Sequence, residues 1–198
     1  MNYVRLMAKV LILFAHPALQ RSRIHQPMIE AVRNLEGVTF HDLYEEYPDF
    51  HINAPREHEL LEQHDVIVFQ HPLYWYTCPA LLTEWIDLVL SPGWAFGPGG
   101  TKLEGKFLLS AITAGVGGEF YRDSDYDKRY PISYFMLPFE QIAFQCGMKY
   151  LQPLIVKNTK SATADDVATH AQNFKNLITD LVAGKTPPMF DSQITPKF

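Results

Sequence analysis

Side chains that could bind a charged ligand gather in residues 16–23, directly after an apolar run. This segment begins with His16 and ends with Arg21, Ser22 and Arg23, where a helix is expected to begin. The unpaired N–H groups and positive dipole of a helix N-terminus suit a phosphate, and the Ser22 hydroxyl adds a donor. The alternative is a solvated turn in which Ser22 only caps the helix.

A second segment, residues 71–78, is dense in aromatic side chains and also follows an apolar run. Tyr74, Trp75 and Tyr76 are adjacent in it. Loops expose such side chains at a cost, so a flat partner packed beside Trp75 is a reasonable inference. Backbone N–H groups of the three aromatic residues could reach the polar edge of that partner. A dimer contact or a core contact by the same side chains explains the pattern equally well.

A third segment, residues 114–130, contains three glycines soon after an apolar run. Glycine allows a backbone to approach a ring closely. Glu119 and Tyr121 are the nearby polar side chains. A simple flexible turn is the alternative, and the position after a strand is what favours a site.

Short apolar runs alternate with longer amphipathic stretches, which indicates strand–helix–strand units and a parallel sheet. The run at residues 9–14 is continuous, as expected of a strand covered on both faces. Ligands of doubly wound sheets bind at the carboxyl ends of the strands where the order reverses, so the three segments should converge. The residues alone leave two strand orders open. We expect strands at 9–14, 38–42, 66–70, 106–113 and 150–156, and helices at 24–35, 55–63, 79–90, 132–147 and 163–183.

Composition narrows the class of protein. The 198 residues fit one domain, and the net charge of −5 argues against a nucleic-acid partner. No stretch approaches the roughly 18 apolar residues that span a bilayer. The apolar run near the start is broken by His16 and Pro17, so it predicts a buried strand rather than a signal peptide. A cytoplasmic protein is expected, with docking on a membrane protein left open.

The chain is expected to fold as one domain over residues 1–184, followed by an arm or disordered tail over residues 185–198. The tail contains Pro187, Pro188 and Pro196. Cys78 and Cys146 form no CxxC pair, and the histidines lack ligand spacing, so we expect no metal site.

Seven short segments, in order along most of the chain, together resemble one family. They are Phe14-Ala-His-Pro17, Asp42-Leu-Tyr44, Tyr47-Pro-Asp-Phe50, Val66-Ile-Val-Phe-Gln-His-Pro-Leu-Tyr74, Pro79-Ala-Leu-Leu82, Glu84-Trp-Ile-Asp87 and Gly97-Pro-Gly-Gly100. They resemble the flavodoxin-fold NAD(P)H dehydrogenase (quinone) family, whose members include the ancillary flavoproteins of bacterial glutathione-gated potassium efflux systems. The resemblance implies an α/β flavodoxin-like sheet of order 2-1-3-4-5 and a homodimer with sites at the interface.

The resemblance also implies a flavin site in the same three segments. FMN is expected rather than FAD, because longer FAD-using relatives have added sequence for the adenosine half. The phosphate region falls on His16, Ser22, Arg23, Ile24 and His25, and the ring contacts fall on Leu73, Tyr74, Trp75, Tyr76, Thr113, Ala114, Gly115 and Val116. Trp75 would bound the ring face, and Tyr121 would hydrogen-bond a quinone oxygen.

Some positions depart from the family pattern. Relatives often have Thr-Thr-Gly-Gly where this chain has Thr113-Ala-Gly-Val116, and a small residue with Asn where it has Ile24 and His25. A titratable ring thus replaces an amide near the expected phosphate. The position of the histidine that flanks the acceptor in mammalian relatives falls near Asp127, so this chain has no clear counterpart of that histidine.

The implied activity is hydride transfer from NADH or NADPH to a quinone by a ping-pong mechanism through the flavin. The alternative is a regulatory subunit that docks on a potassium efflux transporter at the inner face of the membrane, with flavin as ligand or sensor. A flavodoxin-like electron carrier is a third reading. The sequence does not choose between NADH and NADPH.

Overall fold

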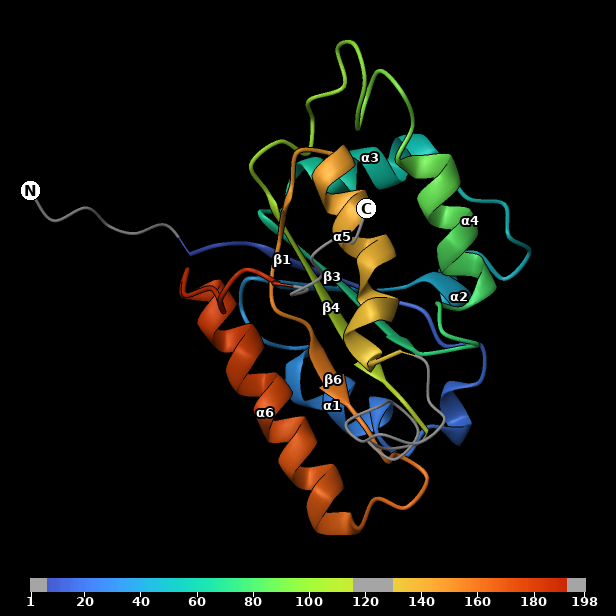
Figure 1. Cartoon of the computed structure of the whole chain (residues 1–198), viewed down its shortest axis with the longest axis vertical. Helices are drawn as coiled ribbons and strands as arrows, with labels where there is room; N and C mark the ends of the chain where they lie inside the picture. Colours follow the sequence, from blue (N-terminus) through green and yellow to red (C-terminus); the bar gives the residue numbers. More distant parts are fainter. Residues whose placement is uncertain (1–6, 116–129, 192–198) are drawn as a thin grey trace, which may run out of the picture.

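A parallel sheet forms the centre of the computed structural model, which describes residues 7–115 and 130–191 (Figure 1). Its strand order is β2-β1-β3-β4-β5, and β6 also pairs with β4. All pairings are parallel. This confirms the α/β doubly wound fold and the flavodoxin-like order. The strands are β1 (Val10–Phe14), β2 (Val38–Asp42), β3 (Val66–Pro72), β4 (Phe107–Thr113), β5 (Lys149–Tyr150) and β6 (Leu154–Val156).

Helices cover both faces of the sheet. Figure 1 shows α6 on the opposite side of the sheet from α4 and α5. One buried cluster joins the sheet to α1 and α6, and the other joins it to α3, α4 and α5. No helix in the described ranges is both long and apolar enough to cross a membrane. The α-helices are α1 (His25–Val32), α2 (Leu43–Glu46), α3 (Ala54–Glu62), α4 (Ala80–Val89), α5 (Leu137–Gln145) and α6 (Ala164–Val182), and the 3-10 helices are η1 (Leu19–Arg21) and η2 (Ile132–Met136).

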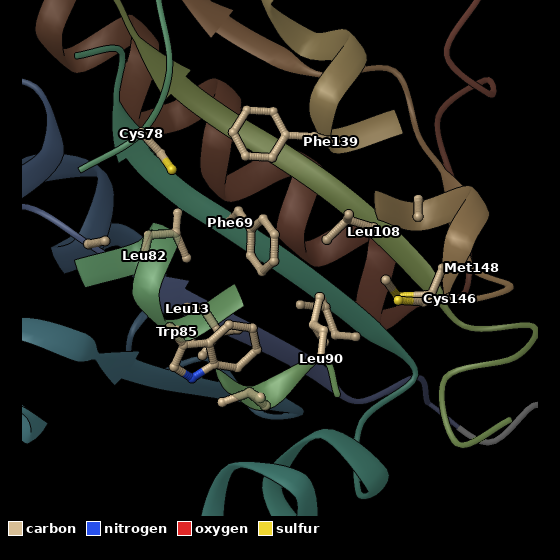
Figure 2. Close-up of a cluster of buried hydrophobic side chains, with 14 of the residues drawn as sticks. Leu13, Phe69, Cys78, Leu82, Trp85, Leu90, Leu108, Phe139, Cys146 and Met148 are labelled. Atoms are coloured by element: carbon tan, nitrogen blue, oxygen red, sulfur yellow. The ribbon is translucent and has the colours of Figure 1, made fainter. Parts of the chain in front are cut away.

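The central strands are buried on both faces, as their continuous apolar sequences predict. In β1, Ile12 faces the α1 side, whereas Leu13 faces the α4 side. Figure 2 shows Trp85 of α4 beside Leu13 and Phe69 in the second cluster. The rings of Trp85 and Phe69 meet edge to face with centroids 6.0 Å apart. This packing fixes the height of α4 along the sheet, and with it the end of the aromatic segment that precedes the helix.

Proline explains two differences from the expected elements. The expected helix over 132–147 begins as η2 and becomes α5 only at Leu137, with Pro138 in the first turn, where its missing N–H costs little. The expected strand over 150–156 is divided into β5 and β6, and Pro153 between them cannot donate to the sheet. A short helix, α2, follows β2 directly, where no helix was expected, and the Asp42 carboxylate caps it by accepting the Tyr44 N–H.

Part of the expected C-terminal arm lies along the edge of the sheet. The Gln152 N–H donates to the Pro188 carbonyl at 2.8 Å, and the Phe190 N–H donates to the Tyr150 carbonyl at 3.0 Å. The Phe190 side chain is buried, and its ring meets that of Tyr150 with centroids 5.4 Å apart. Residues 188–190 therefore belong to the packed structure.

Candidate functional site

The three segments of interest meet at the carboxyl ends of β1, β3 and β4 around an open cavity of about 630 Å³. Their convergence follows from the parallel arrangement, because successive strands end at the same edge of the sheet. The loop between β6 and α6 adds a fourth wall. The lining residues are His16, Arg21, Ser22, Arg23 and Ile24; Pro72, Leu73, Tyr74, Trp75 and Tyr76; Thr113 and Gly115; and Thr159 and Lys160.

The aromatic wall of the cavity is a two-residue hairpin turn. Tyr74 and Thr77 exchange both backbone hydrogen bonds at 3.0 Å. Trp75 and Tyr76 lie between them with φ of 46° and 67°. Such turns favour Asn and Gly, so two aromatic residues in this conformation represent local strain of the kind found at ligand sites. The turn leaves the Trp75 side chain 90% exposed beside the cavity.

Neighbouring rings pack against Tyr74 and Tyr76, the residues on either side of Trp75. The Tyr76 ring packs on Phe135 of η2 with centroids 4.8 Å apart. The Tyr74 ring meets His16 edge to face at 6.5 Å, so the first two segments touch. The residues on either side of Trp75 thus pack against other rings, whereas Trp75 itself is exposed.

His25 lies beneath the cavity rather than in its wall. It is 1% exposed and absent from the lining residues. Its ring Nε2 lies 2.9 Å from the Thr113 hydroxyl, and its Nδ1 lies 3.3 Å from the Gln70 amide nitrogen. Burial, and then the nearby His16 and His71 rings, hold the pKa of His25 well below its usual value. The ring is therefore neutral and turned toward the sheet.

The Ser22 hydroxyl makes a capping contact at the start of α1, and it also lines the cavity. It accepts the backbone N–H of His25 at 3.0 Å, although Ile24 is the residue directly before α1. His16 stands at the end of β1, where its Nδ1 accepts the Ala18 N–H at 3.1 Å. Burial lowers the pKa of His16, so its ring also favours the neutral form.

The third segment contributes mainly backbone. Ala114 is buried in the core, and its N–H donates to the Val156 carbonyl at 2.8 Å. At Gly115 an added Cβ would lie 3.1 Å from Cε of Lys160, so the lysine stem covers this glycine. Two of the expected site residues, Val116 and Tyr121, lie outside the described residues.

Three cationic side chains line the same cavity as the aromatic turn. Arg21 ends η1, Arg23 lies between η1 and α1, and Lys160 comes from the loop before α6. The ion pairs found within residues 7–115 and 130–191 involve none of the three. Sequence reasoning missed Lys160 and Thr159. Their position after the last strand was a usable signal, because β6 ends at the same edge of the sheet as β4.

A second hollow of about 470 Å³ adjoins the first at His16. Its walls include Asp42, Tyr44 and Glu45, so it is acidic where the main cavity is cationic. Burial raises the pKa of Asp42 to about 6. An anionic ligand is therefore favoured only in the main cavity.

The sheet order and the cavity at the carboxyl ends of its strands define a flavodoxin-like protein. A family model for the flavodoxin-like fold matches residues 8–178, and the chain belongs to this family. It is similar to the glutathione-regulated potassium-efflux system ancillary protein KefG of Enterobacter sp. (strain 638), with 49% identity over 167 residues. That match covers 84% of this chain and 91% of the relative.

Solved structures with similar folds have been described with FMN or as quinone reductases. The general stress protein 14 of Treponema denticola, in complex with FMN, is 34% identical with a TM-score of 0.81, covering 87% of this chain and 99% of that protein. An NADPH-quinone reductase from P. pentosaceus is 33% identical with a TM-score of 0.75, covering 85% and 96% respectively.

Proposed function

We propose that the chain is an FMN-dependent NAD(P)H:quinone oxidoreductase. The observation that supports this most is one cavity lined both by a strained, exposed aromatic turn and by three cations. A flat ring that carries a phosphate arm matches both features. The similar protein of Treponema denticola was solved in complex with FMN.

The residues of the cavity fit FMN in size and charge. Its volume of about 630 Å³ lies within the common range for small-molecule sites. A phosphate monoester carries a charge of roughly −1.5 to −2 near neutral pH, which Arg21, Arg23 and Lys160 would balance. Ser22 and the start of α1 would hold the phosphate. Leu73, Thr113 and Gly115 would contact the ring.

Bound FMN would supply the chemistry: it accepts a hydride from the nicotinamide and, after exchange of ligands, passes it to the quinone. The protein would orient the ring and exclude water. Trp75 and Tyr76 would bound its face, and backbone N–H groups of their turn would donate to its polar edge. We assign to Tyr121 a hydrogen bond to the quinone oxygen. A second protomer would cover the open side, so that each site of the homodimer lies at the interface.

The test is a titration of flavin-free protein with FMN, followed by oxidation of NADH and of NADPH in the presence of a quinone. We expect wild-type protein to bind FMN saturably and to oxidise NAD(P)H with the quinone. Both FMN binding and NAD(P)H oxidation should be lost together in Trp75 variants. Lys160→Gln should weaken FMN binding about fivefold, because one charge pair at close range in water contributes about 1 kcal/mol. Lys157→Gln is the matched control, since Lys157 lies in the same loop but not in the cavity wall. A wild-type protein that neither binds FMN nor oxidises NAD(P)H would contradict the proposal.

A regulatory role is the second candidate, because similarity to KefG extends over 84% of the chain. In this role a cytoplasmic protein would dock at the inner face of the membrane on a potassium efflux transporter. Trp75→Ala separates the two: retained control of efflux without turnover favours regulation, and loss of both favours catalysis. Efficient direct oxidation of NAD(P)H would speak against a simple electron carrier.

A further inference from the structure

His25 contacts the first segment and the residues that directly precede the other two. Its backbone N–H donates to Ser22 of the first segment. Its ring contacts Gln70 at the end of β3 and Thr113 at the end of β4. Through its backbone N–H and its ring, His25 thus ties the loop before α1 to β3 and β4.

The direction of these contacts follows from strand alternation. Val68 of β3 and Ala111 of β4 face the α1 side of the sheet. Gln70 and Thr113, two residues further along each strand, face the same side. His25 is the first residue of α1 and lies one turn before Met28, which is buried in that cluster.

The orientation of the Gln70 amide determines which ring nitrogen of His25 carries the proton. With the amide nitrogen placed toward Nδ1 at 3.3 Å, that nitrogen donates and Nδ1 accepts. The neutral ring then carries its proton on Nε2 and donates to the Thr113 hydroxyl at 2.9 Å. A hydroxyl has one hydrogen to donate. Because His25 fills the acceptor side of Thr113, that hydrogen is left for a partner elsewhere.

Of the two side chains that contact the His25 ring nitrogens, Gln70 and Thr113, Thr113 lines the cavity, where it remains 6% exposed. We propose that His25 is a positioning residue, which holds the Thr113 hydroxyl as a hydrogen-bond donor aimed at an acceptor atom on the polar edge of the bound flavin. This rests on the proposed FMN site. It assigns to His25 a role in orienting the ring, in place of contact with the phosphate.

The burial of His25 keeps this arrangement constant over the working pH range. The pKa of the ring lies well below 6.5, first because of burial and then because of the His16 and His71 rings. A protonated ring would need a second acceptor at Nδ1, where the Gln70 nitrogen offers none. The Gln70 carboxamide oxygen has no partner among the described residues.

The first test compares FMN affinity of matched variants by fluorescence titration. His25→Leu should weaken binding about tenfold, the factor of one hydrogen bond, because Thr113 loses its fixed direction. His25→Gln should restore most of the affinity, because the amide nitrogen can replace Nε2 as donor to Thr113. Thr113→Val should match His25→Leu, whereas Thr113→Ser should stay close to wild type.

A double variant separates positioning from a structural role. If His25 acts through Thr113, then His25→Leu should add less than a twofold loss in a Thr113→Val background. Full addition of the two effects, or wild-type affinity of His25→Leu, would overturn the proposal. Urea unfolding of each variant accompanies the titrations and identifies any that is not folded.

The tautomer gives a readout that does not depend on flavin binding. ¹⁵N NMR of flavin-free wild-type protein should show the His25 proton on Nε2, with the signals assigned by their absence in His25→Gln. A proton on Nδ1 would mean that the Gln70 oxygen faces the ring and that Thr113 presents only an acceptor, which overturns the inference. If wild-type protein shows the Nε2 proton but binds no FMN, the proposed function fails while the hydrogen-bond arrangement stands.

Discussion

At the scale of single residues, changes at the strained Trp75 should affect protein stability and FMN binding in opposite directions. Trp75 has a positive φ and 90% of its side chain exposed, so little packing offsets its strain. Trp75→Asn should stabilise flavin-free protein by about 1 kcal/mol in urea unfolding, because Asn adopts this conformation more readily. The same change should weaken FMN binding by removing the face of the ring site.

Trp75→Ala provides the control for that prediction. It also removes the indole but keeps an unfavourable positive φ, so it should lose FMN affinity without gaining stability. Equal stability of the Ala and Asn variants would show that the backbone of this turn is not strained.

At the scale of elements, buried Glu57 joins α3 to β2 and α4. Its carboxylate accepts hydrogen bonds from His41 at 3.0 Å, Tyr47 at 2.5 Å and Trp85 at 2.8 Å. Burial alone would raise the pKa of Glu57, but the three donors together hold it below its usual value. The carboxylate is thus ionised, and it ties the first half of α3 to β2 and α4.

Glu57→Gln should lower the free energy of unfolding by about 2 kcal/mol, because the amide presents a donor to groups that themselves donate. Urea denaturation measures this loss. Glu59→Gln, on the exposed side of the same helix, should change stability by less than about 0.5 kcal/mol. A loss in Glu59→Gln as large as that in Glu57→Gln would assign the effect to the helix rather than to the buried carboxylate.

At the scale of the whole molecule, buried ionisable groups give stability two opposing dependences on pH. Asp42 has its pKa raised from 3.8 to about 6, so above pH 6 its ionised form opposes folding by about 1–3 kcal/mol after screening by solvent. This cost disappears as the pH falls below 4. His71 has its pKa lowered from 6.5 to about 4 by burial, so the folded state loses stability as the pH falls from 6.5 to 4. The two contributions partly cancel between pH 4 and 6.

Asp42→Asn should remove the contribution of Asp42 to the pH dependence of stability and leave that of His71. The amide oxygen can still accept the Tyr44 N–H, so the variant should be more stable than wild type by about 1–3 kcal/mol at pH 7.5, an advantage that roughly halves at pH 5. Chemical denaturation at the two pH values measures this. Asp49→Asn is the control, since exposed Asp49 accepts a similar turn bond from the His51 N–H. An advantage of Asp42→Asn that is independent of pH would exclude the ionisation of Asp42 as its cause.

Much of this organisation is readable from the sequence, because apolar runs and parallel topology are enough to bring three loops to one edge. The strand at residues 38–42 was predicted with the bounds that it has. The inward turn of His25 also had a signal: with Met28, Ile29 and Val32 it forms the i, i+3, i+4, i+7 stripe of a buried helix face.

Other features have no local signal. The turn at Trp75 and Tyr76 lacks the Asn or Gly that would indicate a positive φ in the sequence. Lys160 reaches Gly115 from a loop far along the chain, and only the pairing of β6 with β4 brings the two together. Both depend on tertiary packing, which overrides local preference.

The short segment at residues 188–190 has a consequence for solubility. An open sheet edge offers unpaired N–H and carbonyl groups on which another chain can add as a strand. Here Pro188 and Phe190 use part of the outer side of β5 and the residues after it, and Pro188 has no N–H of its own to offer. The segment thus blocks part of the sheet edge against pairing with another chain. This effect does not depend on any ligand in the cavity.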